Sequence, residues 1–314
     1  MVLWVLGSVM LAAVIVPWVY RGGKLLADAV EGQAVPAWLE WFGAACGAAK
    51  FSRFFNRSLL FCVLALLPVL LRRLKSLGAA ERVPAMDCGA RLTWRSAAAQ
   101  VVTGCVIAGG MLWVMGGVLV AAGAYVPKTA GPAPGLILTK ILLPAVVTSL
   151  VEEWLFRGLL LGLWLRFARP LTACVGTSLL FAFLHFLKPP DVLLIVEPTH
   201  PLAGIQLLGN ILMQFTDPRF FMLDFASLLI VGLILAWARM RTGALWFSIG
   251  LHAGWILVFK GFNLFYYHVP NHPLRSWAVG DSLRCGVVPL FTLGLTAVIC
   301  HCVLRRCALA RPPV

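Results

Sequence analysis

The stretch from residue 136 to residue 167 reads LILTKILLPAVVTSLVEEWLFRGLLLGLWLRF and holds two adjacent carboxylates in an almost wholly apolar run. About twenty apolar residues suffice for a helix to cross the hydrocarbon core of a bilayer. The run is longer than this, so we expect it to tilt, to break near Gly158 or to project into the interface. An ionisable residue at membrane depth is costly unless it is paired or faces water. Glu152 and Glu153 therefore indicate a functional site inside a membrane helix.

The composition of the whole chain is that of a membrane protein. Its 314 residues are 61% hydrophobic, only 12% are charged, and the net charge is +14. A soluble domain has about a quarter of its residues charged. The basic residues lie in short loops at the ends of apolar runs, which is the positive-inside pattern and favours anionic lipid over nucleic acid as a partner. We therefore expect an all-α polytopic membrane protein that binds no nucleic acid.

Eight apolar runs are expected to form membrane spans. They cover residues 1–20, 54–71, 97–125, 136–167, 171–187, 222–240, 244–265 and 286–304. Glycines in the third run would let helices approach closely, residues 25–57 suit a helix in the interface, and residues 188–221 form the longest polar loop. The Lys and Arg bias of the later loops places both termini in the cytoplasm. We expect a multi-pass protein of a bacterial inner (plasma) membrane.

The two carboxylates differ in where a helix would place them. Glu153 and Arg157 are four residues apart and share a helix face, in the favourable order of acid before base. Glu152 is rotated by about 100° from Glu153, so the two cannot play the same role. One of them would face a cavity while the other pairs with Arg157. The alternative is a structural ion network that holds helices together.

Two histidines lie in other apolar runs. His185 is near the end of the fifth run, and His252 lies inside the seventh, where Gly250 and Gly254 would leave room beside it. The expected depths are compatible with one cavity that holds both histidines and Glu152. In such a cavity the carboxylate would take a proton from water, and the histidines would position the water or stabilise the oxyanion. The same groups would also suit a divalent metal such as zinc whose bound water is the nucleophile.

The order of these groups resembles a known family. Three motifs follow one another: Glu152-Glu153-x-x-x-Arg157, Phe181-x-x-x-His185 and, in a separate apolar run, His252. They are similar to the motifs of the CAAX-protease and bacteriocin-processing (CPBP, or Abi) intramembrane proteases. The resemblance implies an eight-helix core and an endopeptidase that cuts a membrane-associated protein, lipidated or bearing a sorting signal. It divides the chain into N-terminal spans and loops (1–135), a catalytic core (136–265), and an outer loop, last span and basic tail (266–314).

The resemblance also implies a role for each residue of these motifs. Glu152 would activate water, and Glu153 and Arg157 would support it. Phe181 would shape the substrate pocket, and His185 and His252 would complete the site. The family includes enzymes classed as metalloproteases and as glutamic-type proteases, so the cofactor stays open.

One position departs from the family pattern. The family usually has His-x-x-x-Asn, but the fourth residue after His252 is Ile256, which has no hydrogen-bonding side chain. In the family the asparagine helps to form the oxyanion site. Lys260, eight residues after His252, would return to a similar helix face and supply a donor, as a substrate-binding residue.

Two other functions remain as alternatives. The first is a non-catalytic membrane binding, immunity or scaffold protein of the same fold, which the missing asparagine favours. The second is a transporter that uses Glu152, Glu153 and Lys140 as a proton or ion path. An endopeptidase would have a membrane protein or a lipidated peptide as its partner, together with the lipid bilayer.

Overall fold

The computed structural model describes residues 2–76, 93–129, 131–187, 197–218, 220–275, 278–279 and 283–306. Nearly all of these residues are helical, which confirms the all-α membrane class. The chain packs as two units, Met1–Arg82 with Leu184–Pro218, and Val83–Phe183 with Arg219–Val314. The three parts expected from the sequence remain a prediction.

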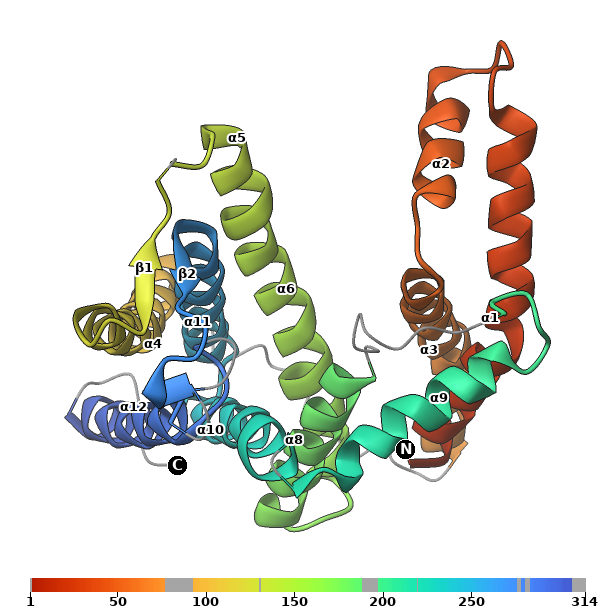
Figure 1. Cartoon of the computed structure of the whole chain (residues 1–314). Coiled ribbons are helices and arrows are strands. Elements are labelled where there is room, and N and C mark those ends of the chain that lie inside the picture. The colour runs from red at the N-terminus through yellow and green to blue at the C-terminus, as the bar shows by residue number, and fades with distance from the viewer. Residues whose placement is uncertain are drawn as a thin grey trace. The chain divides into compact units, whose positions relative to one another are not determined.

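The first unit is built on a helical hairpin. Its elements are α1 (Val2–Val30), α2 (Ala37–Gly47), α3 (Phe51–Ser76), α9 (Ala203–Met213) and the short η3 (Gln214–Thr216). Helix α2 folds back along the end of α1 (Figure 1), and Gly43 lets it lie against Val30. The Lys24 ammonium of α1 donates to the backbone oxygens of Gly47 and Ala49, and this closes the C-terminal end of α2. The stretch expected at the interface thus contains a helix that is held against α1.

Helix α9 corrects the expectation of a polar loop over residues 188–221. Prolines are typical of loops, but Pro198, Pro201 and Pro218 flank α9 and do not interrupt it. The helix buries Leu207 and Ile211, and its contact with α1 depends on Gly204. The part of this stretch before Glu197 lies outside the described residues.

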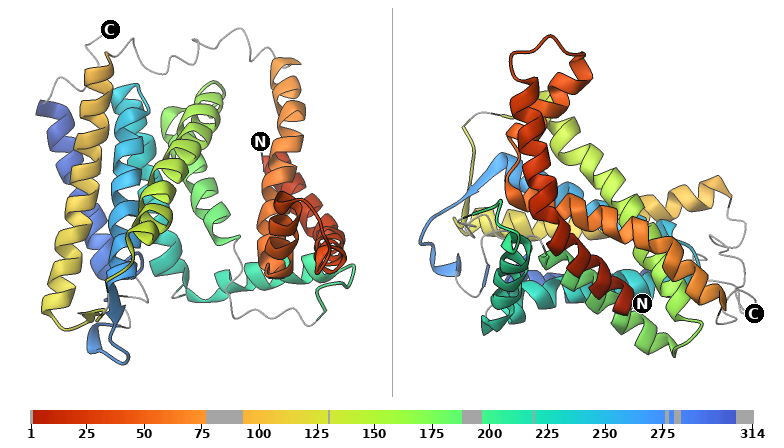
Figure 2. Two further views of the ribbon diagram at one scale, coloured as in Figure 1. Left: turned by 90° about the horizontal axis from the view of Figure 1, so that it is seen from above. Right: turned by 90° about the vertical axis from the view of Figure 1, so that its right-hand side faces the viewer.

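The second unit contains the remaining elements. They are α4 (Trp94–Ala121), β1 (Tyr125–Pro127), α5 (Pro134–Ile137), η1 (Leu138–Leu142), α6 (Leu143–Glu153), η2 (Trp154–Leu160), α7 (Leu161–Trp164), α8 (Pro170–Phe186), η4 (Phe220–Phe225), α10 (Ala226–Thr242), α11 (Trp246–Phe265), β2 (Tyr266–His268), η5 (Pro273–Arg275) and α12 (Val287–Arg306). Strands β1 and β2 pair antiparallel, with Tyr125 opposite His268. In the left-hand view of Figure 2, α4 runs from the top of this unit to the strand pair at the bottom.

The acidic stretch forms one long, nearly continuous helix from Pro134 to Trp164. It does not break at Gly158. Instead, two segments, η1 and η2, have π-helical hydrogen bonding, and η2 begins directly after the two glutamates. Single π-helical turns inside α-helices occur frequently at functional sites. The buried residues Ile141, Ala145, Ser149 and Glu153 recur every four positions and form one face of this helix, which packs against α11.

Helices α4 and α11 run in the same direction and approach each other through glycine. A Cβ atom at Gly250 would lie 2.2 Å from the backbone oxygen of Val101, and one at Gly254 would lie 2.5 Å from that of Cys105. On the α4 side, a Cβ atom at Gly104 would lie 2.6 Å from a backbone oxygen of α11. Distances this short leave no space for a methyl group. Glycine at these positions therefore sets the separation of the two backbones, as small residues do in membrane helix pairs.

This contact makes a testable prediction about two glycine-to-alanine changes. Gly250→Ala is expected to destabilise the protein by about 1–3 kcal/mol, because the added methyl group must push α11 away from α4. Gly110→Ala is the matched control, since a Cβ atom there meets nothing within 4 Å. Alanine is favoured over glycine in a helix by roughly 0.5–1 kcal/mol, so the control should be slightly stabilised. Thermal unfolding in detergent should show shifts of opposite sign, and equal shifts would contradict the close approach.

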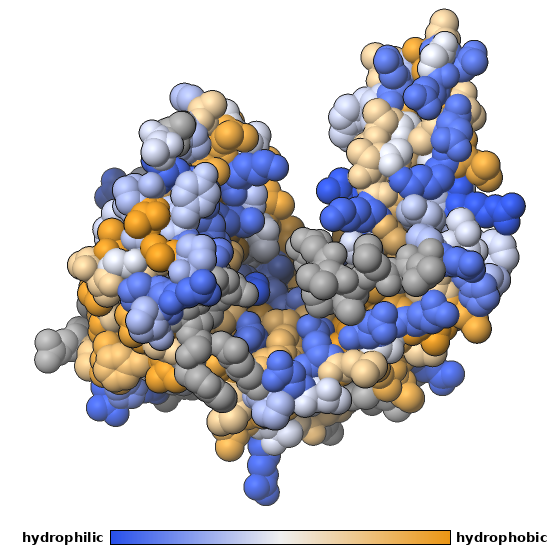
Figure 3. Space-filling view, in the orientation of Figure 1, coloured by the Kyte–Doolittle hydropathy of each residue, from blue (hydrophilic) through white to orange (hydrophobic). Residues whose placement is uncertain are grey.

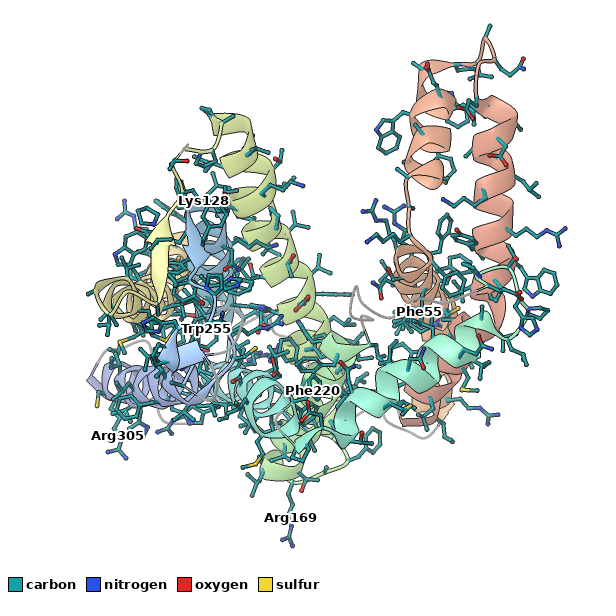
Figure 4. All side chains as sticks on the ribbon, in the orientation of Figure 1. Phe55, Lys128, Arg169, Phe220, Trp255 and Arg305 are labelled. Atoms are coloured by element: carbon teal, nitrogen blue, oxygen red, sulfur yellow. The ribbon has the colours of Figure 1, made fainter. Side chains whose placement is uncertain are left out.

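The core of the second unit continues along α10, α11 and α12. Leu251 and Phe247 of α11 pack with Leu235 of α10, and Phe262 packs with Leu119 of α4 near the strand pair. Trp255, labelled in Figure 4, packs against both groups of side chains. This packing holds α11 along its whole length between α4 and the last helices.

Six helices of the described chain are long and apolar enough to cross a membrane. They are Leu3–Val30, Phe51–Leu70, Trp94–Ala121, Pro134–Trp164, Met222–Thr242 and Val287–Arg305. The other two expected spans are also helices, but α8 is shorter, and α11 carries His252, Lys260 and Asn263. Apolar side chains such as Phe291, which is 68% exposed, lie on the outside of α12. Hydrophobic residues also lie at the surface in Figure 3. The protein is thus an integral multi-pass membrane protein, and the count of eight spans remains a prediction.

Candidate active site

Glu153 is the centre of a buried polar cluster in the second unit. Its side chain is 0% exposed, and its Oε1 atom lies 2.9 Å from Nη1 of Arg157 and 2.9 Å from Nδ1 of His252. A carboxylate oxygen only accepts hydrogen bonds, so both nitrogens donate to it. We assign the Nδ1 proton of His252 on this ground. Glu153 thereby joins the long helix to α11.

Arg157 is enclosed on three sides. Besides the bond to Glu153, its Nη2 atom donates to the backbone oxygen of Gly232 in α10 at 3.3 Å. The guanidinium carbon lies 4.3 Å from the centre of the Phe181 ring, which is a cation–π distance. The side chain is 2% exposed. A buried charge needs such partners, because breaking a buried ion pair leaves an uncompensated charge.

Phe181 of α8 connects the arginine to the histidine. Its ring lies edge-on to Phe156, with ring centres 5.1 Å apart, and edge-on to His252, with ring centres 6.0 Å apart. The ring is fully buried. One aromatic face therefore contacts Arg157 while the ring as a whole limits the space around the imidazole of His252.

Glu152 has a different environment from its neighbour. Its side chain is 25% exposed, and its Oε2 atom lies 3.8 Å from Nε2 of His252. This distance exceeds a direct hydrogen bond, and the Oε2 atom itself is buried although the side chain as a whole is partly exposed. With Nδ1 of His252 directed at Glu153, Nε2 is the ring nitrogen that faces Glu152. The rotation between adjacent helix positions thus separates a buried carboxylate from a more open one.

Two further residues expected at the site lie on α8 and α11. His185 lies on the last turn of α8, four residues after Phe181, and belongs to the first unit. Its participation remains a prediction. Lys260 lies eight residues after His252 on α11, which corresponds to about 12 Å along the helix axis. Its role as a substrate-binding donor remains a prediction.

The space expected beside His252 is also corrected. Gly250 and Gly254 do not open a cavity, because their faces are covered by the backbone of α4. Two contributors to the cluster were not predicted from the sequence, the backbone oxygen of Gly232 and the ring of Phe156. Every residue has a backbone oxygen, so the sequence does not indicate which of them accepts a hydrogen bond from Arg157. For the ring of Phe156, the indication in the sequence was its position next to Arg157.

A metal ion requires several donor atoms arranged around one point. Within the part of the chain that the structure describes, no group of three or more His, Cys, Asp or Glu side chains is arranged to hold a metal. Glu152 and Nε2 of His252 offer two donors, whereas a catalytic zinc takes three protein ligands. The described residues of the cluster alone do not fit such an ion.

The fold and the cluster together define a multi-helix membrane protein with a buried carboxylate–arginine–histidine site. Residues 134–258 match the family model described as type II CAAX prenyl endopeptidase Rce1-like. The chain therefore carries an Rce1-like domain, which confirms the resemblance to the CAAX-protease family. The match covers the cluster from Glu152 to His252 and supports a peptidase, a CAAX-type intramembrane endopeptidase in general. No curated protein and no solved structure matches the chain.

Proposed function

We propose that the protein hydrolyses a peptide bond of a membrane-associated protein, lipidated or bearing a sorting signal, with Glu152 as the base that activates water. The observation that carries this proposal is the asymmetry of the two glutamates. Glu153 is fully buried and bonded to two donors, whereas Glu152 is partly exposed and lies 3.8 Å from Nε2 of His252. Only Glu152 is therefore able to reach both a water molecule and a substrate.

The proposed reaction uses these groups in sequence. Nε2 of His252 accepts a hydrogen bond from the water and orients it, because Glu153 holds the proton on Nδ1. Glu152 takes the proton as the water oxygen attacks the carbonyl carbon. The same proton then passes from Glu152 to the leaving nitrogen as the C–N bond breaks. Arg157 pairs with Glu153 and holds it in place, and it does not touch the substrate.

His185 is proposed as the second histidine of the site. It lies four residues after Phe181 on α8, and residues four apart share a helix face. Since His252 acts as an acceptor in the proposed mechanism, His185 is left as the donor to the oxyanion. In this mechanism Phe181 shapes the substrate pocket next to His252.

The proposed location is a bacterial inner membrane with both termini in the cytoplasm. Among the described residues of the second unit, the end at which α4 starts carries more basic residues than the opposite end. The positive-inside rule assigns such an end to the cytoplasm. Its basic residues are Arg95, Arg166, Arg169, Arg239, Arg241, Arg305 and Arg306; Arg169 and Arg305 are labelled in Figure 4. His252 lies six residues into α11, about 9 Å from that end. A substrate would thus be cut near the cytoplasmic leaflet.

Cleavage assays test the proposal directly. Purified wild type and Glu152→Gln would be incubated with farnesylated peptides and with single-span proteins, each with and without a chelator. Cleavage by wild type that is lost in Glu152→Gln is the expected result. Loss of wild-type activity in the chelator would show that a metal ion, and not the carboxylate alone, activates the water.

A non-catalytic binding or immunity protein is the second candidate, and one observation favours it. Ile256 stands where the family has an amide donor, so the oxyanion would have less stabilisation. Binding of these substrates without cleavage by wild type, across the whole set, would decide for this candidate.

A further inference from the structure

The last turn of α8 carries His185, and a side chain from a distant part of the chain binds the end of this turn. Nε2 of Gln214 donates a hydrogen bond of 2.8 Å to the backbone oxygen of Phe186, the last residue of α8. The last carbonyl groups of a helix have no partner within the helix, and a buried one needs a partner elsewhere. Phe186 is buried, so Gln214 supplies this partner at the residue next to His185.

A ring contact adds to this hydrogen bond. Phe215, which follows Gln214, lies edge-on to Phe186 with ring centres 6.4 Å apart. Gln214 and Phe215 belong to η3, which directly continues α9. One polar and one apolar contact thus hold the end of α8 to η3. The position of this end therefore depends on the position of α9.

Helix α9 is in turn fixed to α1, against which it lies (Figure 1). A Cβ atom at Gly204 in the first turn of α9 would clash with the backbone oxygen of Ala13. Pro17 stands inside α1, four residues after Ala13, and has no N–H group to donate to that oxygen. A Cα–H group of Gly204 approaches the oxygen in its place. Within the first unit, α9 therefore contacts α1 at one end and, through η3, the last turn of α8 at the other.

We propose that Gln214 is a positioning residue for His185, and that α9 carries this role from α1 to the end of α8. This rests on the proposed function, in which His185 is the donor to the oxyanion. Such a donor is effective only when it points at the place where the charge develops. The imidazole of His185 follows the backbone of the last turn, so a loosened turn would misdirect it. A misplacement of about 1 Å can cost about 10²-fold in rate.

Histidine NMR tests the positioning without requiring turnover. The full-length protein in detergent would carry carbon-13 at Cε1 of its six histidines, and the His185→Asn variant would assign the signal of His185. Gln214→Met keeps the length of the side chain but removes the donor, so it is expected to shift or broaden this signal. The signals of the other histidines should stay in place, which shows that the variant is folded.

Two further variants assign the effect to the hydrogen bond. Gln214→Lys supplies a donor again and should return the His185 signal toward its wild-type position. Gln206→Met is the matched control, because Gln206 is an exposed glutamine on the same helix. An unchanged His185 signal in Gln214→Met, or an equal change in Gln206→Met, would overturn the proposal.

A pair of glycine variants tests the part played by α1. Gly204→Ala is expected to disturb the His185 signal as Gln214→Met does, because the added methyl group pushes α9 away from Ala13. Gly209→Ala is the control on the same helix, since a Cβ atom there meets nothing within 4 Å. A His185 signal that responds to Gln214→Met but not to Gly204→Ala would overturn the role of α1.

Cleavage kinetics relate the positioning to the reaction and separate it from the proposed function. Gln214→Met should lower kcat for a farnesylated peptide roughly tenfold or more at an unchanged KM, because an oxyanion donor acts in the transition state. Gln214→Lys should recover most of this loss. An unchanged kcat in Gln214→Met would overturn the proposal while the hydrolase stands. If wild type cleaves nothing but Gln214→Met still changes the His185 signal, the hydrolase fails and the positioning of His185 stands.

Discussion

Glutamine at position 152 is expected to lower the rate of peptide hydrolysis by about 10³-fold or more while the unfolding temperature stays that of wild type. Glutamine has the size of glutamate but cannot take a proton from water, and general-base catalysis contributes typically 10²–10⁴-fold. The side chain is 25% exposed, so the loss of its charge leaves no buried charge uncompensated. The measurement is cleavage of a farnesylated peptide together with thermal unfolding in detergent.

Glutamine at position 153, unlike glutamine at position 152, is expected to lower the stability of the protein. The activity should be lost together with the stability. Arg157 would keep its charge at 2% exposure without its carboxylate partner. Breaking a buried ion pair from one side costs about 3–5 kcal/mol. Unfolding should therefore occur at a clearly lower temperature or denaturant concentration in Glu153→Gln than in Glu152→Gln.

A double variant distinguishes a charge effect from a packing effect. Glu153→Met combined with Arg157→Met removes both charges, and apolar replacement of a buried pair is often neutral for stability. The double variant should therefore be more stable than Glu153→Gln but inactive, since His252 loses the acceptor that holds its Nδ1 proton. Equal stability of Glu152→Gln and Glu153→Gln would contradict the division of roles between the two carboxylates.

Asparagine at position 256 is expected to raise the rate of hydrolysis by roughly 10²-fold. Ile256 lies one helical turn after His252 on α11, on the same face, and its side chain is partly buried. An amide there would add a donor toward the developing oxyanion, and one such donor is worth about 10²–10³ in kcat. The increase should appear in kcat, because the donor acts in the transition state.

Two controls accompany the asparagine variant. Ile256→Leu keeps the side chain apolar and should leave kcat near that of wild type. Ile256→Asn combined with Glu152→Gln should be inactive, which shows that the added rate belongs to the same reaction. An unchanged or lower kcat in Ile256→Asn would mean that another group already stabilises the oxyanion.

Much of the helical arrangement follows from apolar run length alone. Each of the eight expected runs coincides with a helix, because twenty apolar residues in a row have few alternatives in a bilayer. The missed helix, α9, is short and flanked by prolines, and its identity depends on contacts with α1. Local composition does not contain such contacts between segments that are distant in the chain.

The residues of the candidate site could be predicted from the sequence more readily than the distances between them. The four-residue spacing of Glu153 and Arg157 predicted their ion pair, which the structure contains at 2.9 Å. Glu153 also binds His252, which is 99 positions later in the chain. This contact depends on the position of α11, which the close glycine contact with α4 determines. The role of Lys260, eight residues after His252 on the same helix, remains a prediction.

The shared oxygen of Glu153 has a consequence for the timing of events in a reaction. Arg157 and His252 both bind Oε1, and Phe181 packs against both, so these dipoles already have their working orientation before a substrate arrives. Preorganised groups need little rearrangement while charge develops in a transition state. In the proposed reaction, water around a similar charge would have to reorient as the charge develops. The groups of the cluster are already fixed by helix packing, so we expect folding to supply the energy for that ordering.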